Sequence, residues 1–281
     1  MSPWRAAARR FRRNRPAVAG TVVVAAMAAA ALLAPRVTVD PLAQPDPVGL
    51  QDRPPSAAHP LGTDPYSRDV LSRTLHGARV SLLVGVGAAL LAVTLGTGVG
   101  LAAGLGGRRT DEVLMRGVDV ALALPRIVLL LAVFAIWDRA PPAAVVVLIA
   151  ATGWFQTSRI VRASVLGLKQ ADFVAAARAL GSGRGGIVRR HLLPHVAAPV
   201  IVSASLDVGN IILLEAGLSY LGLGVRPPTP TWGNMIMDGK DVLLSAPWVA
   251  LAPGCALVLT VVAFNLAGDG LRDALDPRAA A

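Results

Sequence analysis

Long apolar runs separated by short polar segments dominate this chain from residue 17 onward. A helix needs about 20 mostly apolar residues to cross a lipid bilayer. Six runs suit that role: residues 17–34, 80–107, 120–137, 140–158, 196–225 and 242–267. Strand periodicity is absent, and open sheets are not stable in lipid. The pattern therefore predicts an all-α fold, a polytopic membrane bundle of six transmembrane helices.

The first run has two interpretations. It follows an arginine-rich start and contains small residues such as Ala28 and Ala30, as a secretory signal peptide does. However, its apolar stretch is longer than a typical signal core, and further spans follow it. We interpret it as an uncleaved first membrane helix.

Composition supports a membrane protein. The chain is 54% hydrophobic and only 16% charged, whereas soluble domains carry about 25% charged residues. With the N-terminus in the cytosol, eighteen basic residues lie in cytosolic segments and eight in external ones. Cytoplasmic loops carry such an excess of arginine and lysine. The bias places both termini and residues 159–195 in the cytosol, with residues 35–79 and 226–247 outside.

The same bias explains the net charge of +10. A basic chain can bind nucleic acid or an anionic membrane. Because topology accounts for the basic residues, the composition implies a lipid membrane as the partner and no nucleic acid. The N-terminal arginines serve either as a topology anchor or as a helix lying on the inner leaflet.

The cytosolic segment 159–195 contains two short helical patterns around a glycine. Residues 172–180 include good helix formers, and Gly181 is a suitable stop because glycine adopts the left-handed backbone of a helix end. Pro194 is predicted to start the next long helix, with a second short helix in between. A pair of short helices around a glycine, facing the cytosol, is typical of a docking element.

This segment resembles the "EAA" loop of membrane subunits of bacterial ABC importers. The family pattern is Glu-Ala-Ala, three residues, Gly, nine residues, Ile, one residue, Leu-Pro. Here Ala175 replaces the Glu and His191 replaces the Ile, while the remaining positions match. The resemblance implies a coupling helix that sits in a cleft of the ATPase subunit, with one charge fewer at that contact. The candidate coupling residues are Asp172, Ala175, Ala176, Ala177, Arg178, Gly181, Leu193 and Pro194.

Further segments resemble the dipeptide/oligopeptide/nickel permease family, in its "C" type. They are His-Pro-Leu-Gly-Thr-Asp at 59–64, Arg-Asp-Val-Leu-Ser-Arg at 68–73, Gly-Ala-Arg-Val-Ser-Leu at 77–82, Leu-Ser-Tyr-Leu-Gly-Leu-Gly at 218–224, Phe-Asn-Leu-Ala-Gly-Asp-Gly-Leu-Arg-Asp at 264–273 and Leu-Asp-Pro-Arg at 275–278. The resemblance implies a type I ABC importer permease. Its transmembrane domain would cover 80–281, after a tail and first helix at 1–34 and an external loop at 35–79.

The resemblance also implies partners and a location. The family forms a heterodimer with a "B"-type permease and works with two ATP-binding subunits and an extracytoplasmic substrate-binding protein. The expected location is the bacterial inner membrane, and the expected mechanism is alternating access driven by ATP. The implied cargo is a small peptide or a similar solute such as chelated nickel.

The chain itself lacks motifs for ATP hydrolysis. A P-loop needs Gly-Lys followed by Ser or Thr, whereas Gly239-Lys240 is followed by Asp241. A Gly-x-Gly-x-x-Gly sequence at 181–186 follows a predicted helix and not a strand, so a dinucleotide site is not supported. We therefore predict no enzymatic activity and no cofactor, with ATP hydrolysis in partner subunits.

His191 and His195 are spaced to share a helical face. A metal site would need further ligands, and neither Cys nor an acid is close in sequence. We interpret the two histidines as an interfacial polar pair and predict no metal.

The run 196–225 contains three candidates for the translocation path: Asp207, Asn210 and Glu215. Intramembrane acids are costly and usually face a cavity or a partner. Asp207 and Glu215 would lie about 80° apart around a helix. The alternative is that each acid is solvated or paired near a membrane boundary, and the residues alone leave both interpretations open.

Two features of the second and third runs predict helix contacts. Gly96, Gly100 and Gly104 recur every four residues, which lets another helix approach closely, either in static packing or in sliding as a gate opens. Arg126 interrupts the third run and is predicted to pair with Asp119 or with an acid of the partner subunit.

Two other classes of membrane protein compete with the importer. An ion-gradient-driven secondary transporter would usually show inverted repeats and broken helices, and it would need no basic docking loop. No such repeat is evident in the sequence. A non-transporting membrane scaffold is the third class, and loss of uptake on deletion would separate it from both transporters.

Overall fold

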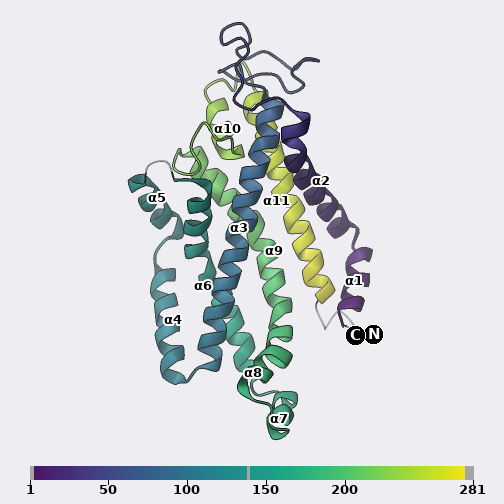
Figure 1. Ribbon diagram of the computed structural model, residues 1–281, viewed down its shortest axis with the longest axis vertical. Coiled ribbons are helices and arrows are strands. Elements are labelled where there is room, and N and C mark those ends of the chain that lie inside the picture. The colour runs from purple at the N-terminus through teal and green to yellow at the C-terminus, as the bar shows by residue number, and fades with distance from the viewer. Residues whose placement is uncertain (1–2, 138–139, 276–281) are drawn as a thin grey trace.

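The computed structural model describes residues 3–137 and 140–275, which form an elongated bundle of helices (Figure 1). Its long helices are α2 (Arg15–Val37), α3 (Val70–Leu105), α6 (Pro142–Leu168), α9 (Leu193–Tyr220) and α11 (Trp248–Leu275). Its shorter elements are α1 (Pro3–Arg13), α4 (Arg108–Ala123), α5 (Arg126–Ile136), α7 (Asp172–Ala179), α8 (Arg184–Ile187), η1 (Val188–Leu192) and α10 (Trp232–Gly239).

The all-α prediction is confirmed. Apart from one isolated bridge between Thr63 and Asp69, the described residues contain no β-structure. Residues 276–278 of the C-terminal motif lie outside the described residues, as do Arg139 and Arg278 among the basic residues.

Within the described ranges, five helical stretches are long and apolar enough to cross a membrane: α2, α3, α6, the continuous stretch Gly185–Tyr220 and α11. Together α4 and α5 make a sixth candidate, although the two helices meet at 77°. The prediction of six spans is confirmed with the third span broken.

The expectation of one uninterrupted helix over 120–137 is wrong. α4 ends at Ala123 and α5 begins at Arg126. Leu124 and Pro125 between them have extended backbones, with ψ of 131° and 111°. Proline disfavours the helical conformation in the residue before it and has no N–H to continue the hydrogen-bond ladder. The helix therefore breaks at this dipeptide, and α5 leaves the axis of α4.

α3 starts at Val70, well before the predicted start at residue 80. The Asp69 side chain caps this end, because its Oδ1 accepts a hydrogen bond of 2.7 Å from the backbone N–H of Ser72. The first turns of α3 are polar in sequence, and Arg73 is nonetheless only 1% exposed. The apolar run marks only part of this helix, and the helix itself continues into the loop layer formed by residues 38–69 and α10.

The packing of α3 against α6 depends on glycine. A Cβ atom on Gly96 would lie 2.6 Å from the carbonyl oxygen of Trp154, and one on Gly100 would lie 2.5 Å from that of Ser158. Gly104 continues the row toward the end of α3. Side chains at these positions would hold the two backbones apart, so the predicted close approach is confirmed.

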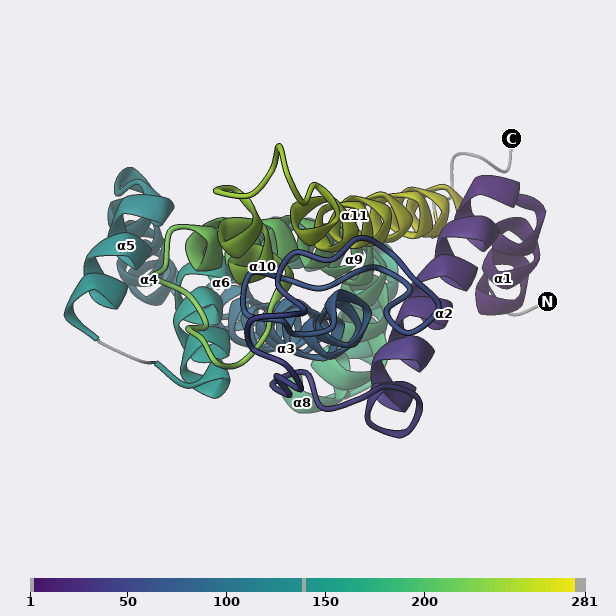
Figure 2. The same cartoon turned by 90° about the horizontal axis from the view of Figure 1, so that it is seen from above.

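The connection between α2 and α3, residues 38–69, folds over one end of α3 beside α10 (Figures 1 and 2). The opposite end of the molecule carries α7 (Figure 1). The bundle thus separates a large loop layer at one end from the predicted docking element at the other.

Candidate coupling loop and translocation path

α7 is a short helix with a fully formed C-terminal cap. Gly181 has a φ of +82°, its N–H donates to Arg178 O at 2.9 Å, and Ser182 N–H donates to Ala177 O at 3.0 Å. These two bonds form a Schellman motif, in which the left-handed residue is nearly always glycine. The predicted stop at Gly181 is confirmed.

One face of α7 is anchored to the bundle. Val174 and Ala177 are buried, and Val174 packs in a cluster with Val161 and Val165 of α6 and with Leu192 of η1. This cluster of aliphatic side chains fixes the short helix, which would not be stable alone. The candidate residues Asp172, Ala175, Ala176, Arg178 and Gly181 are all exposed, so the remaining face of α7 is available to another protein.

An aromatic stack links α7 to the start of α9. The Phe173 ring lies 5.1 Å from the His195 ring at an interplanar angle of 19°, and 6.1 Å from the His191 ring. His195 Nδ1 donates a hydrogen bond of 2.6 Å to His191 O, which holds its ring in place. The described residues contain no group of three or more possible metal ligands. The two rings thus lie at the contact between α7 and the start of α9, and their role as an interfacial polar pair stays a prediction.

α9 begins at Leu193 with Pro194 in its first turn, as predicted, but it is continuous with the elements that precede it. The helical backbone continues from Ile187 through Leu192 into α9, and Leu193 N–H donates to Val188 O, five residues back. This wider π-helical turn accommodates a proline that offers no N–H and whose ring would crowd the carbonyl four residues earlier. Leu193 and Pro194 are therefore part of one continuous helical rod, Gly185–Tyr220.

Ion pairs join α6 to α4, the first half of the broken third span, in the part of the molecule that carries α7. Arg162 donates to both carboxylate oxygens of Asp111 through its Nε and Nη2, and Arg159 pairs with Asp119. Lys169 Nζ donates to Gly104 O at 2.8 Å, which places a positive charge at the carbonyl end of α3. These contacts connect the end of α6, which precedes α7, to α3 and to α4.

The predicted pair of Arg126 with Asp119 is wrong. The Arg126 guanidinium donates to Ile149 O at 2.9 Å and to Thr152 Oγ1 at 3.1 Å, both on α6. The break at Pro125 is the reason, because residues 119 and 126 no longer share one helix and one face.

The three path candidates have different surroundings. Asp207 is half-buried and accepts a hydrogen bond of 3.4 Å from Ser203, while Asn210 is exposed. Glu215 is 0% exposed, and its carboxylate accepts hydrogen bonds from Ser81 at 3.1 Å and Ser219 at 2.7 Å. For Glu215 this geometry favours the alternative of a paired acid. The structure does not bring the three side chains together on one surface.

Comparisons with known proteins agree with the geometry. Residues 76–281 match the family model described as binding-protein-dependent transport system inner membrane component, and residues 2–55 match that of the N-terminal TM domain of oligopeptide transport permease C. The chain belongs to this family of permeases. The permease is 41% identical to the dipeptide transport system permease protein of Alkalihalophilus pseudofirmus, over 99% of this chain and 91% of the relative. It is 36% identical to the oligopeptide transport system permease protein of Bacillus subtilis, over 99% and 90% of the two chains.

The loop layer of the permease, formed by residues 38–69 and α10, contains a buried ionic network. Asp238 Oδ2 of α10 accepts hydrogen bonds of 3.2 Å from both Arg68 and Arg73, and Asp64 pairs with Arg68 at 2.7 Å. Burial raises the pKa of the Asp238 carboxyl, and the positive charges of Arg73 and Arg68 oppose that rise. The network ties the loop 38–69 to the start of α3 and to α10.

The sequence pattern indicates no role for this network. Its residues at 64, 68 and 73 lie in segments that carry the family resemblance, and they were predicted only to be part of the external loop. Trp248 and Trp232 add two further ties, because their ring N–H groups donate to Thr63 O at 3.0 Å and to Thr74 O at 3.1 Å. Tryptophans next to polar loop residues could have indicated these ties in advance, since a buried tryptophan usually finds a hydrogen-bond acceptor.

Proposed function

We propose that this permease forms half of the translocation path of an ATP-driven importer of small peptides. Membership of a binding-protein-dependent transport family supports an importer over an ion-gradient-driven transporter. The names of two relatives, which state dipeptide and oligopeptide transport, support peptides over chelated nickel. The proposed partners are a second permease, two ATP-binding subunits and an extracytoplasmic substrate-binding protein.

α7 carries the proposal that ATP hydrolysis occurs in partner subunits and is transmitted through residues 159–195. Its buried face holds the helix on α6 and η1, and its exposed face presents Asp172, Ala176 and Arg178. The Phe173 stack and the continuous rod through Pro194 give a mechanical connection from that face to α9. When ATP closes the ATPase dimer, a rotation of α7 would turn α9 and open the path outward.

The proposed location is the bacterial inner membrane, with both termini in the cytosol. The basic excess of the cytosolic segments supports this orientation. α1 and the end of α11 lie in the half of the molecule that carries α7 (Figure 1). The layer of residues 38–69 and α10 would then face the binding protein.

For the path itself, Asp207 and Asn210 are the stronger candidates of the three. Asn210 is exposed on the protomer, and Asp207 is half-buried with a hydrogen bond of 3.4 Å from Ser203. An exposed polar side chain in a membrane helix favours a water-filled cavity or a partner over lipid. Glu215 remains part of the proposal only as an acid that shapes the outer end of α9.

The test of coupling compares Gly181→Val with Gly183→Val. A Cβ atom added at either position meets no atom within 4 Å, but of the two only Gly181 has a positive φ. A β-branched residue is strongly disfavoured there, at roughly 1–2 kcal/mol or more. We expect ATP-binding subunits to co-purify with wild type and Gly183→Val in mild detergent, and several-fold less with Gly181→Val.

The readout is quantitative mass spectrometry of the purified complex together with its ATPase rate. Equal recovery with both variants would remove α7 from the coupling contact. Absence of ATP-binding subunits even from wild type would contradict the importer and restore the gradient-driven alternative.

A further inference from the structure

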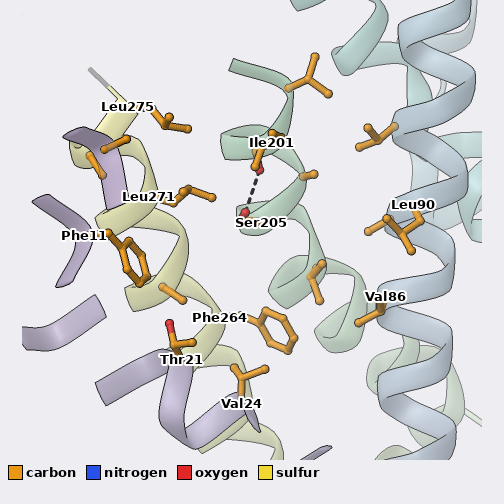
Figure 3. Close-up of a pocket in the computed structure, with 18 of the residues that line it drawn as sticks. Phe11, Thr21, Val24, Val86, Leu90, Ile201, Ser205, Phe264, Leu271 and Leu275 are labelled. Atoms are coloured by element: carbon orange, nitrogen blue, oxygen red, sulfur yellow. Dashed lines mark hydrogen bonds between the residues drawn. The ribbon is translucent and has the colours of Figure 1, made fainter. Parts of the chain in front are cut away.

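An apolar groove of about 720 Å³ opens between helices of the bundle, beside the N-terminal helices (Figure 3). α1, α2 and α11 form one side of it, and α3 and α9 form the other. Leu90 and Ile201 in its wall are 62% and 39% exposed, so the groove opens to the surface of the molecule. A groove of this size accommodates a ligand.

The walls of the groove offer almost no polar partner. Thr21 and Ser205 line it, but their hydroxyl groups donate to Ala17 O and Ile201 O of their own helices, each at 2.8 Å. A peptide segment in this groove would leave its backbone N–H and C=O groups unpaired, which is costly. A hydrocarbon chain has no such groups, so the wall chemistry favours an acyl chain.

A positive charge stands beside this apolar space. Arg12 both lines the groove and is exposed, which places it at the rim. Its helix, α1, contains five arginines and no acidic residue, and it turns Ala7 and Phe11 toward the bundle. Guanidinium groups bind phosphate oxygens with strong, charge-assisted hydrogen bonds.

The position of α1 fits the level of lipid headgroups. α1 ends at Arg13, and the first candidate membrane span starts at Arg15. The arginines therefore lie where an amphipathic helix meets the membrane surface, next to a groove that runs along the span. A phospholipid is the molecule that combines an acyl chain at that depth with a phosphate at that level.

The groove is separate from the proposed translocation path. Its α9 residues, such as Ala204, Ser205 and Val208, share one face of the helix. Asn210 lies about 160° around α9 from the middle of that face. Substrate moving past Asn210 would thus not enter the groove.

We propose that this groove is a binding site for an anionic phospholipid of the leaflet that contacts α1. The acyl chain lies between α11 and α9, and the phosphate pairs with Arg12. The bound lipid fills the space between the N-terminal helices and the bundle, and so fastens α1 and α2 to α9.

The test uses the full-length permease, purified with the subunits that accompany it and reconstituted in lipid nanodiscs. The probe is phosphatidylglycerol with a photoreactive diazirine in one acyl chain, compared with phosphatidylethanolamine carrying the same chain. We expect the anionic probe to label peptides that contain Leu90, Ile201 and Leu271, roughly fivefold more than the zwitterionic one.

Two pairs of variants sharpen the result. Arg12→Gln removes the rim charge, while Arg13→Gln makes the same change at an exposed neighbour that does not line the groove. Ala204→Phe fills the groove, while Ala25→Phe adds the same ring on an exposed face of α2 outside it. Labelling should fall to the level of the zwitterionic probe in Arg12→Gln and disappear from the groove in Ala204→Phe, with both controls unchanged.

Three outcomes would overturn the proposal. Equal labelling by both probes that is insensitive to Arg12→Gln would indicate bulk lipid around the protein. Labelling of the isolated chain that vanishes in the assembled complex would show that a partner subunit occupies the groove. Labelling of the same peptides by a photoreactive transported peptide would make the groove part of the path. The two variant pairs are independent. If a variant of one pair does not fold, the other pair still tests the proposal.

Discussion

Glu215 is an ionisable side chain with no exposure, placed on a helix that crosses the membrane. A buried acid is tolerated when other groups donate hydrogen bonds to it. Ser81 of α3 and Ser219 of α9 supply those donors, and Ser219 Oγ also accepts a bond from Val225 N–H at 3.1 Å. One carboxylate thus joins two spans and helps to fix the turn after α9.

Replacing Glu215 by alanine should destabilise the permease. The change leaves the hydroxyls of Ser81 and Ser219 buried without their acceptor, at a cost of about 1–3 kcal/mol for each unpaired group. Thermal unfolding of the purified protein, followed by tryptophan fluorescence, should show a lower midpoint for Glu215→Ala. Asn210→Ala is the control, because Asn210 is exposed on the same helix. Equal midpoints for the two variants would contradict the structural role of Glu215.

At the scale of the elements, backbone proximity decides which helices pack. α3 and α6 approach along Gly96, Gly100 and Gly104, where a Cβ atom would overlap the facing helix. In lipid there is no hydrophobic drive between helices, so close van der Waals contact along small residues supplies much of the association. Sliding along this row as a gate opens stays a prediction.

A pair of alanine substitutions on α3 tests this packing. Gly100→Ala places a methyl group 2.5 Å from Ser158 O and 2.7 Å from Val161 Cβ, and we expect a loss of about 1–3 kcal/mol in the free energy of unfolding. Gly98 is two residues away and has nothing within 4 Å of a Cβ atom. Gly98→Ala should be neutral or gain up to about 1 kcal/mol from helix propensity. Denaturant or thermal unfolding in detergent measures both, and equal destabilisation would argue against the packing role.

Across the whole molecule, the loop layer is attached to the bundle by charge. Arg68 comes from the loop 38–69 and Arg73 from the first turn of α3, whereas Asp238 comes from α10, more than 160 residues later in the chain. Buried ion pairs contribute little net stability, but breaking one leaves an uncompensated charge. The network therefore sets where the loop 38–69 lies on the membrane domain, which is the surface proposed to receive the binding protein.

The substitution Asp238→Asn should loosen that loop without unfolding the bundle. Loss of a hydrogen bond to a charged group costs about 1.5–3 kcal/mol, which raises the population of a detached loop by roughly tenfold or more. Limited proteolysis from the external side should cut residues 38–69 correspondingly faster. Asp241→Asn, an exposed acid just beyond α10, should leave the cleavage rate unchanged. If both variants were cut at the wild-type rate, the network would not hold the loop.

The sequence alone determined the features that depend on local chemistry. Span number and position follow from runs of apolar residues, and the stop at Gly181 follows from the backbone freedom of glycine. The close approach at Gly96 and Gly100 follows from the spacing of small residues. Each depends on neighbours in the chain, which the sequence displays directly.

Only the tertiary structure decided which distant groups meet. Arg126 was expected to reach Asp119 but contacts α6 after the break at Pro125, and the polar start of α3 proved to be buried by Asp64 and Asp238. Glu215 meets Ser81 across more than 130 residues of chain, and the apolar groove arises from five helices at once. Hydropathy and spacing specify one helix at a time, whereas the partner of a buried charge depends on how the helices are placed against one another.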